Sequence, residues 1–185
     1  MATNVNCRLH ICIVSAFGLQ NTDFGSLSDP YCRLTVDGQE IAKTHVVDNN
    51  LSPVWHTQVR LHLQGQVDPR AVVFNFSLYD KDKFTKDDFL GHYEMTLEEM
   101  LSAAAQGTHT YMLERRKHRR DKVTGSLTLE VTARDGAAAE DGDLKWHFQN
   151  ARLRPGGLSS HAKTSIGSQI HDKIAALGSM SPRSK

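Results

Sequence analysis

Residues 72–88 read VVFNFSLYDKDKFTKDD, an apolar, strand-like run that ends in a loop rich in carboxylates. Side chains two positions apart point to the same face of a strand, so Asp80 and Asp82 are expected to project together from its end. The loop then returns Asp87 or Asp88 toward them. Two like charges about 4 Å apart at an effective dielectric constant near 20 repel by about 4 kcal/mol. Carboxylates gathered on a flexible loop therefore favour a hard cation, and Ca²⁺ suits them better than zinc or iron.

An EF-hand loop is the first alternative for such a stretch. That loop places Asp or Asn at its fifth position, Gly at its sixth and a bidentate Glu at its twelfth. Counted from Asp80, these positions hold Phe84, Thr85 and Gly91, so the pattern fails at all three. Another scaffold must hold the site.

Composition restricts the class of protein. The 185 residues correspond to one domain with room for an extension, or barely to two domains, and a net charge of +1 predicts no nucleic-acid partner. Three irregularly spaced cysteines fit a reducing compartment. The absence of a membrane-length apolar run and of a signal-peptide pattern predicts a cytoplasmic protein. The chain has no Gly-x-Ser-x-Gly motif and no phosphate-binding glycine loop, and we predict that it is not an enzyme.

Apolar segments separated by turn signals predict an all-β sandwich with eight strands. The Asp37-Gly38 pair predicts a type I′ hairpin turn, and a capping box at Thr96 and Glu99 opens one short helix that ends before Gly107. The expected strands are residues 8–15, 31–36, 40–45, 56–63, 72–79, 90–95, 108–113 and 126–132.

The composition changes after Ala133 to Gly, Ser and Ala with few large apolar residues. Such a segment cannot bury enough surface to offset its ordering entropy. We therefore predict a folded domain at 5–133 and a mostly disordered tail at 134–185. A short amphipathic helix along Ile166, Ile170 and Ile174 is the alternative for part of the tail.

Four ordered motifs resemble those of a C2 domain, the calcium- and lipid-binding module of synaptotagmins and protein kinase C. They are LSDPY at 27–31, NNLSPVW at 49–55, YDKD at 79–82 and DFLG at 88–91. The resemblance covers 7–133 and implies an eight-stranded antiparallel β-sandwich with three loops at one end. Because the first strand feeds the first of these loops and residues 126–132 close the fold, the order resembles the permuted, type II topology of phospholipase C.

In calcium-binding members of this family, two aspartates of the first loop and three of the third form the metal site. The resemblance implies as Ca²⁺ ligands Asp23, Asp29, Asp80, Asp82 and Asp88, with Asp87 as the alternative to Asp88. The backbone carbonyls of Thr22, Lys81 and Lys86 and the Thr85 hydroxyl would complete the shell. Phe24 and Phe84 match positions that enter the bilayer, with Lys83 and Lys86 at the headgroups; the alternative is that each ring packs on its own loop.

Two basic surfaces are further candidates for contact with anionic lipid. One would combine Lys43 and His45 of the third strand with Arg60 and His62 of the fourth. The other is the run that contains Arg115, Arg116, Lys117, Arg119 and Arg120, which suits an acidic lipid, a nucleic acid or a partner but is also compatible with a solvated connection.

These features together predict calcium-dependent binding to anionic phospholipid, such as phosphatidylserine or phosphoinositides. The protein would be a monomeric, peripheral membrane-recruitment or adaptor module in signalling or membrane trafficking. The alternative is a calcium-independent protein-interaction scaffold, with a protein partner bound through the tail.

Overall fold

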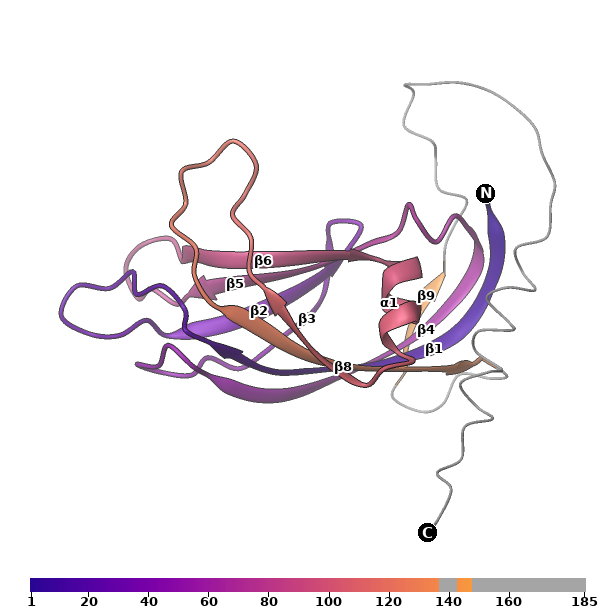
Figure 1. Ribbon diagram of the computed structural model, residues 1–185, viewed down its shortest axis with the longest axis horizontal. Coiled ribbons are helices and arrows are strands. Elements are labelled where there is room, and N and C mark those ends of the chain that lie inside the picture. The colour runs from indigo at the N-terminus through magenta and orange to yellow at the C-terminus, as the bar shows by residue number, and fades with distance from the viewer. Residues whose placement is uncertain (137–142, 148–185) are drawn as a thin grey trace, which may run out of the picture.

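Two β-sheets pack face to face in the computed structural model, which describes residues 1–136 and 143–147 (Figure 1). The five-stranded sheet has the order β7-β8-β1-β4-β9, and the four-stranded sheet has the order β3-β2-β5-β6. The elements in chain order are β1 (Thr3–Phe17), β2 (Pro30–Val36), β3 (Gln39–Lys43), β4 (Val54–Val67), β5 (Val73–Asp80), β6 (Asp88–Thr96), α1 (Leu97–Ala103), β7 (Thr108–Met112), β8 (Ser126–Asp135) and β9 (Leu144–His147). The eight predicted strands and the predicted helix are all present, in the predicted order.

The first strand of the sandwich lies between two partners that are distant in sequence. β1 pairs antiparallel with β4 on one side and with β8 on the other. The first strand and the eighth are therefore neighbours, as the type II order requires. This arrangement delivers the chain from β1 directly into the long loop that precedes β2.

Alternating apolar residues fill the space between the sheets. Phe74, Phe76 and Leu78 of β5 are fully buried, and they face Leu61 and Leu63 of the opposite sheet within one apolar cluster. Burial of each such side chain contributes about 1.5–3 kcal/mol. This core fixes the strand ends from which the loops project.

The predicted turn and cap are confirmed. Asp37 and Gly38 have φ values of 48° and 82°, and a type I′ turn requires positive φ at both of its central residues. Thr96 accepts a hydrogen bond from the Glu99 N–H, and the Glu99 side chain accepts one from the Thr96 N–H. No helix in the described residues is long and apolar enough to cross a bilayer.

A ninth strand, which the sequence did not predict, lies at the edge of the five-stranded sheet. β9 pairs in parallel with β4, from Leu61 opposite Leu144 onward. The predicted tail therefore contains the end of β8 and all of β9. Residues 137–142 and 148–185, with the predicted isoleucine stripe at 166–174, lie outside the described residues.

Candidate functional site

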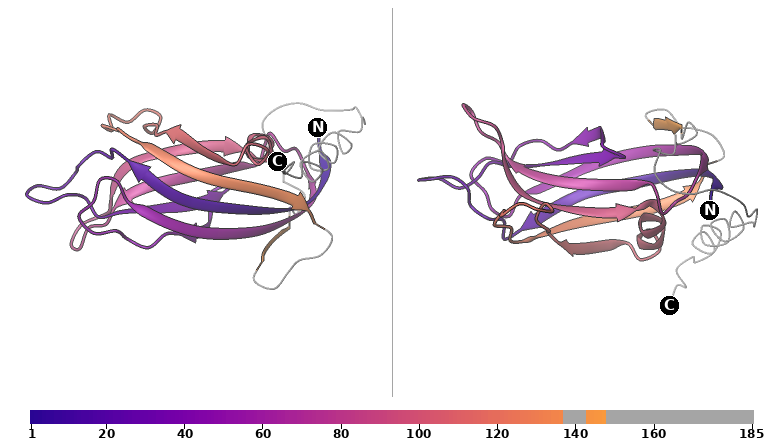
Figure 2. Two further views of the ribbon diagram at one scale, coloured as in Figure 1. Left: turned by 60° about the horizontal axis from the view of Figure 1, so that its bottom comes forward. Right: turned by 90° about the horizontal axis from the view of Figure 1, so that it is seen from above.

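Three loops meet at one end of the sandwich (Figures 1 and 2). We call them loop 1 (residues 18–29), loop 2 (residues 44–53) and loop 3 (residues 81–87). Backbone hydrogen bonds join loop 1 to both of the others: the Asn50 N–H donates to the Ser28 carbonyl at 2.9 Å, and the Lys81 N–H donates to the Asp29 carbonyl at 3.0 Å. These hydrogen bonds hold the three loops together without a ligand.

Asp80, the last residue of β5, fastens loop 1 to the sheet. It is 1% exposed. One carboxylate oxygen accepts a hydrogen bond from the Thr22 hydroxyl at 2.6 Å, and the other accepts one from the Asp29 N–H at 2.6 Å. Charge-assisted bonds of this kind are stronger than neutral ones. They hold a buried carboxylate at the centre of the loop end.

The predicted ligands Asp23, Asp29, Asp80, Asp82 and Asp88 form what we call the acidic cluster. Asp88 begins β6 directly opposite Asp80 in the sheet. Burial raises the pKa of Asp88, and the negative charges of Asp82, Asp80 and Asp23 raise it further. A carboxyl group in this setting gains from a nearby cation. Four of the five predicted ligands therefore act on one another electrostatically, and the fifth, Asp29, is bonded to Asp80 through its backbone.

The carboxylates of loop 1 have partners within the protein. Asp29 accepts a hydrogen bond from the Asn49 N–H at 2.7 Å, and Asp23 accepts one from the Ser26 hydroxyl at 3.0 Å. Within residues 1–136 and 143–147, no group of three or more His, Cys, Asp or Glu side chains is already arranged to hold a metal ion. The donor atoms are all hard oxygens, which fit Ca²⁺, and each of these two loop 1 carboxylates has one oxygen engaged in these bonds.

Asp87 differs from its neighbour Asp88. It accepts hydrogen bonds from the Tyr31 hydroxyl at 2.7 Å and from the Lys81 ammonium at 2.8 Å. Although burial acts in the opposite direction, the bonds from Lys81 and Tyr31 hold the pKa of Asp87 below its ordinary value. Asp87 is therefore bonded within the protein, and the choice between Asp87 and Asp88 as the last ligand stays a prediction.

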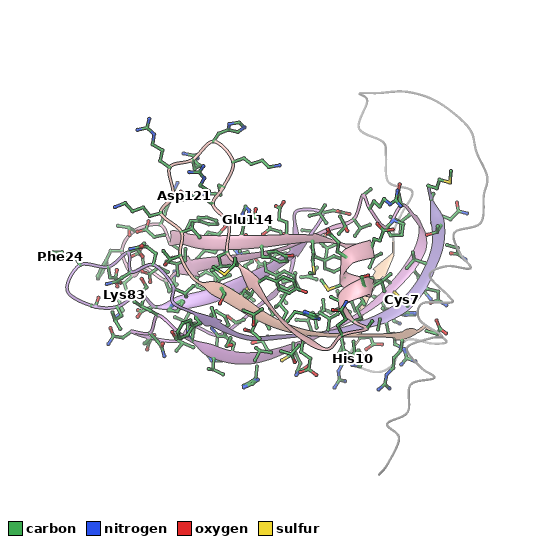
Figure 3. All side chains as sticks on the ribbon, viewed as in Figure 1. Cys7, His10, Phe24, Lys83, Glu114 and Asp121 are labelled. Atoms are coloured by element: carbon green, nitrogen blue, oxygen red, sulfur yellow. The ribbon has the colours of Figure 1, made fainter. Side chains whose placement is uncertain are left out.

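The tips of loops 1 and 3 present bare aromatic rings. Phe24 and Phe84 are fully exposed, so neither ring packs on its own loop. Lys83 and Lys86 are exposed on either side of Phe84. Figure 3 shows Phe24 and Lys83 projecting at the same end of the molecule, away from the end that holds Cys7.

A profile of the C2 domain matches residues 7–113. The chain belongs to the C2 domain family. It is 38% identical over 96 residues to the protein C2-DOMAIN ABA-RELATED 11 of Arabidopsis thaliana, an alignment that covers 52% of this chain and 54% of that protein. The chain thus spans about half the length of this relative.

Solved structures of C2 domains match the fold. The C2A domain of plant extended synaptotagmin 1 superposes with a TM-score of 0.58 at 26% identity and covers 72% of this chain and 97% of that one. The calcium-bound C2A and C2B domains of extended synaptotagmin 2 give a TM-score of 0.58 at 25% identity, over 72% of this chain and 48% of that one. These C2-domain relatives support a membrane- or lipid-binding module.

The outer face of the four-stranded sheet carries a feature that the sequence did not predict. Tyr31, Tyr79 and Phe89 lie side by side across β2, β5 and β6, with ring centroids 5.7 and 5.8 Å apart. Burial and the hydrogen bond to Asp87 raise the pKa of Tyr31 to about 12. Three cations lie over this aromatic row: Lys43 over Tyr31 at 3.8 Å, Arg33 over Tyr79 at 5.0 Å and Arg116 over Phe89 at 4.2 Å.

The structure does not assemble the predicted basic patch on the third and fourth strands of this C2 domain. β3 and β4 belong to different sheets, so Lys43 and Arg60 do not share a surface. His62 is 3% exposed and lies 3.1 Å from the Asn6 side-chain oxygen. The cation next to Lys43 is Arg33, its cross-strand partner on β2.

Residues 113–125, which we call the basic loop, connect β7 and β8. The loop contains the predicted basic run, whose arginines and lysines are exposed. Arg116 differs from the other cations of the run because it pairs with Asp121 through two hydrogen bonds of 2.9 and 2.7 Å. Figure 3 shows Glu114 and Asp121 where the loop rises from the sandwich.

Proposed function

We propose that this C2 domain, residues 5–133, binds anionic phospholipid membranes in a calcium-dependent manner. The observation that carries the proposal is the position of Asp88, whose carboxyl faces the charges of Asp82, Asp80 and Asp23. This negative field lies beside two fully exposed phenylalanines, Phe24 and Phe84. The site therefore combines a place for a cation with a surface suited to apolar lipid.

Calcium would be held by the acidic cluster. Further oxygens would come from the backbone carbonyls of Thr22, Lys81 and Lys86 and from the Thr85 hydroxyl. The bound ion would cancel the negative charge that repels an anionic bilayer. A cation near such a surface is worth about 1 kcal/mol per charge, so reversal of several charges changes binding strongly.

The protein's own residues would then make the membrane contact. Phe24 and Phe84 would enter the acyl region, and each buried ring contributes about 1.5–3 kcal/mol. Lys83 and Lys86 would meet phosphatidylserine headgroups. Lys43, which lies over the aromatic row, would contact headgroups such as phosphoinositides when the domain tilts.

The protein in this proposal is a monomeric, cytoplasmic module that associates with membranes peripherally and recruits or adapts other components in signalling or trafficking. The alternative is a protein-interaction scaffold that needs no calcium, with the tail as a partner contact. Binding to vesicles separates the two functions.

The test is co-sedimentation of the full chain with phosphatidylserine vesicles, in calcium and in chelator. We expect pelleting in calcium alone, and its loss in the double variant Asp80→Asn with Asp82→Asn. Because Asp80 is buried and bonded, the pair Asp82→Asn with Asp88→Asn provides a second variant that leaves it intact. Asp37→Asn, in the hairpin at the opposite end, should pellet like the natural chain. Absence of pelleting in both buffers would support the scaffold instead.

A further inference from the structure

The basic loop leaves the sandwich at the same end as loops 1 and 3 and rises past β6 (Figures 1 and 2). Residues 114–122 contain six Lys or Arg against two acids, a net charge of +4. The base of the loop is firmly held: the Glu114 N–H donates to the His92 carbonyl at 2.7 Å, and the His92 N–H donates to the Glu114 carbonyl at 2.9 Å. The charge is therefore carried on an anchored segment.

Arg116 braces the loop from within. Its guanidinium binds both oxygens of Asp121 and also lies 4.2 Å from the centroid of the Phe89 ring on β6. The hydrogen bonds from Arg116 hold the pKa of Asp121 below its ordinary value. Bidentate pairs of this kind fix geometry as well as adding energy. The brace occupies both oxygens of Asp121, although the charge of Arg119 also acts on this carboxylate.

Residues 114–120 of the braced loop line a hollow of about 730 Å³ that is open to solvent. Ligand sites in proteins commonly measure about 300–1,000 Å³. Within the described residues, no salt bridge involves the four other cations that line the hollow, Arg115, Lys117, Arg119 and Arg120. His118, with φ of 62°, lies in the turn of the loop, between Lys117 and Arg119.

The chemistry of the lining favours clustered phosphate groups. Arginine presents a planar fork that matches phosphate oxygens, and lysine adds a compact charge. The loop has no Phe, Tyr or Trp on which nucleic-acid bases could stack.

We propose that the basic loop is a second anion site, independent of calcium, whose ligand carries two or more closely spaced phosphate groups. Such groups occur on polyphosphorylated lipid headgroups and on soluble polyphosphates. The site uses no residue of the acidic cluster, so it stands whether or not the calcium-dependent function holds.

The first experiment uses the full chain in chelator. Calorimetry measures binding of inositol trisphosphate and of tripolyphosphate, and sedimentation compares vesicles that contain phosphatidylinositol bisphosphate with phosphatidylserine vesicles of equal total charge. Saturable heat together with selective pelleting identifies a lipid headgroup as the source. Saturable heat without pelleting identifies a soluble ligand. Neither heat nor selective pelleting overturns the proposal.

Two variants test the built geometry. Arg119→Gln with Arg120→Gln should weaken inositol trisphosphate binding about tenfold or more, since both charge-assisted contacts to phosphate are lost. Arg60→Gln with Arg70→Gln removes the same charge elsewhere and should bind normally. The loop variant should keep calcium-dependent pelleting on phosphatidylserine, which separates the failure of this site from failure of the other.

The Asp121→Asn variant distinguishes a built site from simple charge attraction, because the two predict opposite changes in ligand affinity. It makes the loop more positive, so simple charge attraction requires tighter binding. If Arg116 must be braced for the hollow to form, binding instead becomes weaker, with the melting temperature and the calcium-dependent pelleting unchanged. Tighter binding by Asp121→Asn overturns the proposal of a built site.

Discussion

At the scale of single residues, two adjacent aspartates have opposite roles. Asp87 is bonded to Tyr31 and Lys81 and thereby links loop 3 to the aromatic row. Asp88 points into the field of Asp82, Asp80 and Asp23. One carboxylate is satisfied by the protein, and the other is left in a position where positive charge would stabilise it.

Replacing these two aspartates should therefore change stability in opposite directions. A raised folded-state pKa means that ionised Asp88 weakens the fold at neutral pH, so Asp88→Asn should raise the melting temperature in chelator, by about 1–3 °C. The same change should abolish any rise caused by calcium. Asp87→Asn should lower the melting temperature, because it removes the ion pair with Lys81. Thermal scans with calcium and with chelator measure both variants, and a shift in the same direction for both would contradict this account.

The acidic cluster was proposed from local motifs and from their resemblance to a C2 domain, and its role as a calcium site stays a prediction. Asp80 and Asp82 are two apart on a strand end, and Asp29 precedes a proline. Their hydrogen-bond partners could not be predicted, because Thr22 and Asn49 are brought to them only when loops 1 and 2 fold together. The choice between Asp87 and Asp88 likewise depends on Tyr31, which lies far away in sequence.

At the scale of elements, the basic loop and loop 1 share a tight junction. The Thr124 hydroxyl donates a hydrogen bond to the Gly18 carbonyl at 2.9 Å. Gly125, with φ of 95°, follows at a point where a Cβ atom would lie 2.5 Å from the Phe17 carbonyl oxygen. The positive φ of Gly125 and the nearby carbonyl oxygen of Phe17 both exclude a side chain at this position.

Gly125→Ala should therefore destabilise the domain by about 1–3 kcal/mol, because it combines a strained φ with a backbone collision. Gly38→Ala is the matched control: its φ of 82° is also positive, but nothing lies within 4 Å of the added atom. The control should cost about 1 kcal/mol, from φ alone. Urea unfolding of both variants measures the difference, and equal costs would show that the junction tolerates the extra atom.

The elements themselves were well predicted, because each of the eight strands carries its own apolar pattern between turn residues. The failures involve relations between strands. Lys43 and Arg60 were placed together because β3 and β4 are consecutive, yet the chain changes sheets between them. The row of Tyr31, Tyr79 and Phe89 depends on the register of three strands, and β9 has too few residues to show a pattern.

At the scale of the whole molecule, the sandwich presents distinct functional surfaces at one end. Loops 1 and 3 and the adjoining ends of β5 and β6 carry the acidic cluster, loops 1 and 3 carry the exposed rings, and the basic loop stands beside them (Figure 1). The core lies between the sheets, away from these surfaces. Binding can therefore be altered at the loop tips without affecting the fold.

Loss of either tip ring should weaken membrane binding without changing stability. Phe24→Ala and Phe84→Ala should each reduce the affinity for phosphatidylserine vesicles in calcium about tenfold or more, because a buried Phe contributes about 1.5–3 kcal/mol. Phe17→Ala is the matched control, since Phe17 is 72% exposed but lies at the end of β1 and not at a loop tip. Vesicle titrations measure the affinities. An equal loss for Phe17→Ala would mean that general hydrophobicity, not the loop tips, drives binding.

β9 has a further consequence for how the protein behaves at high concentration. An open strand edge offers unpaired N–H and C=O groups to other chains and promotes their addition, strand by strand, into aggregates. β4 would have such an edge along Leu61–Gln64, within a segment that contains no acidic residue. By pairing with these residues, β9 closes this stretch against self-association.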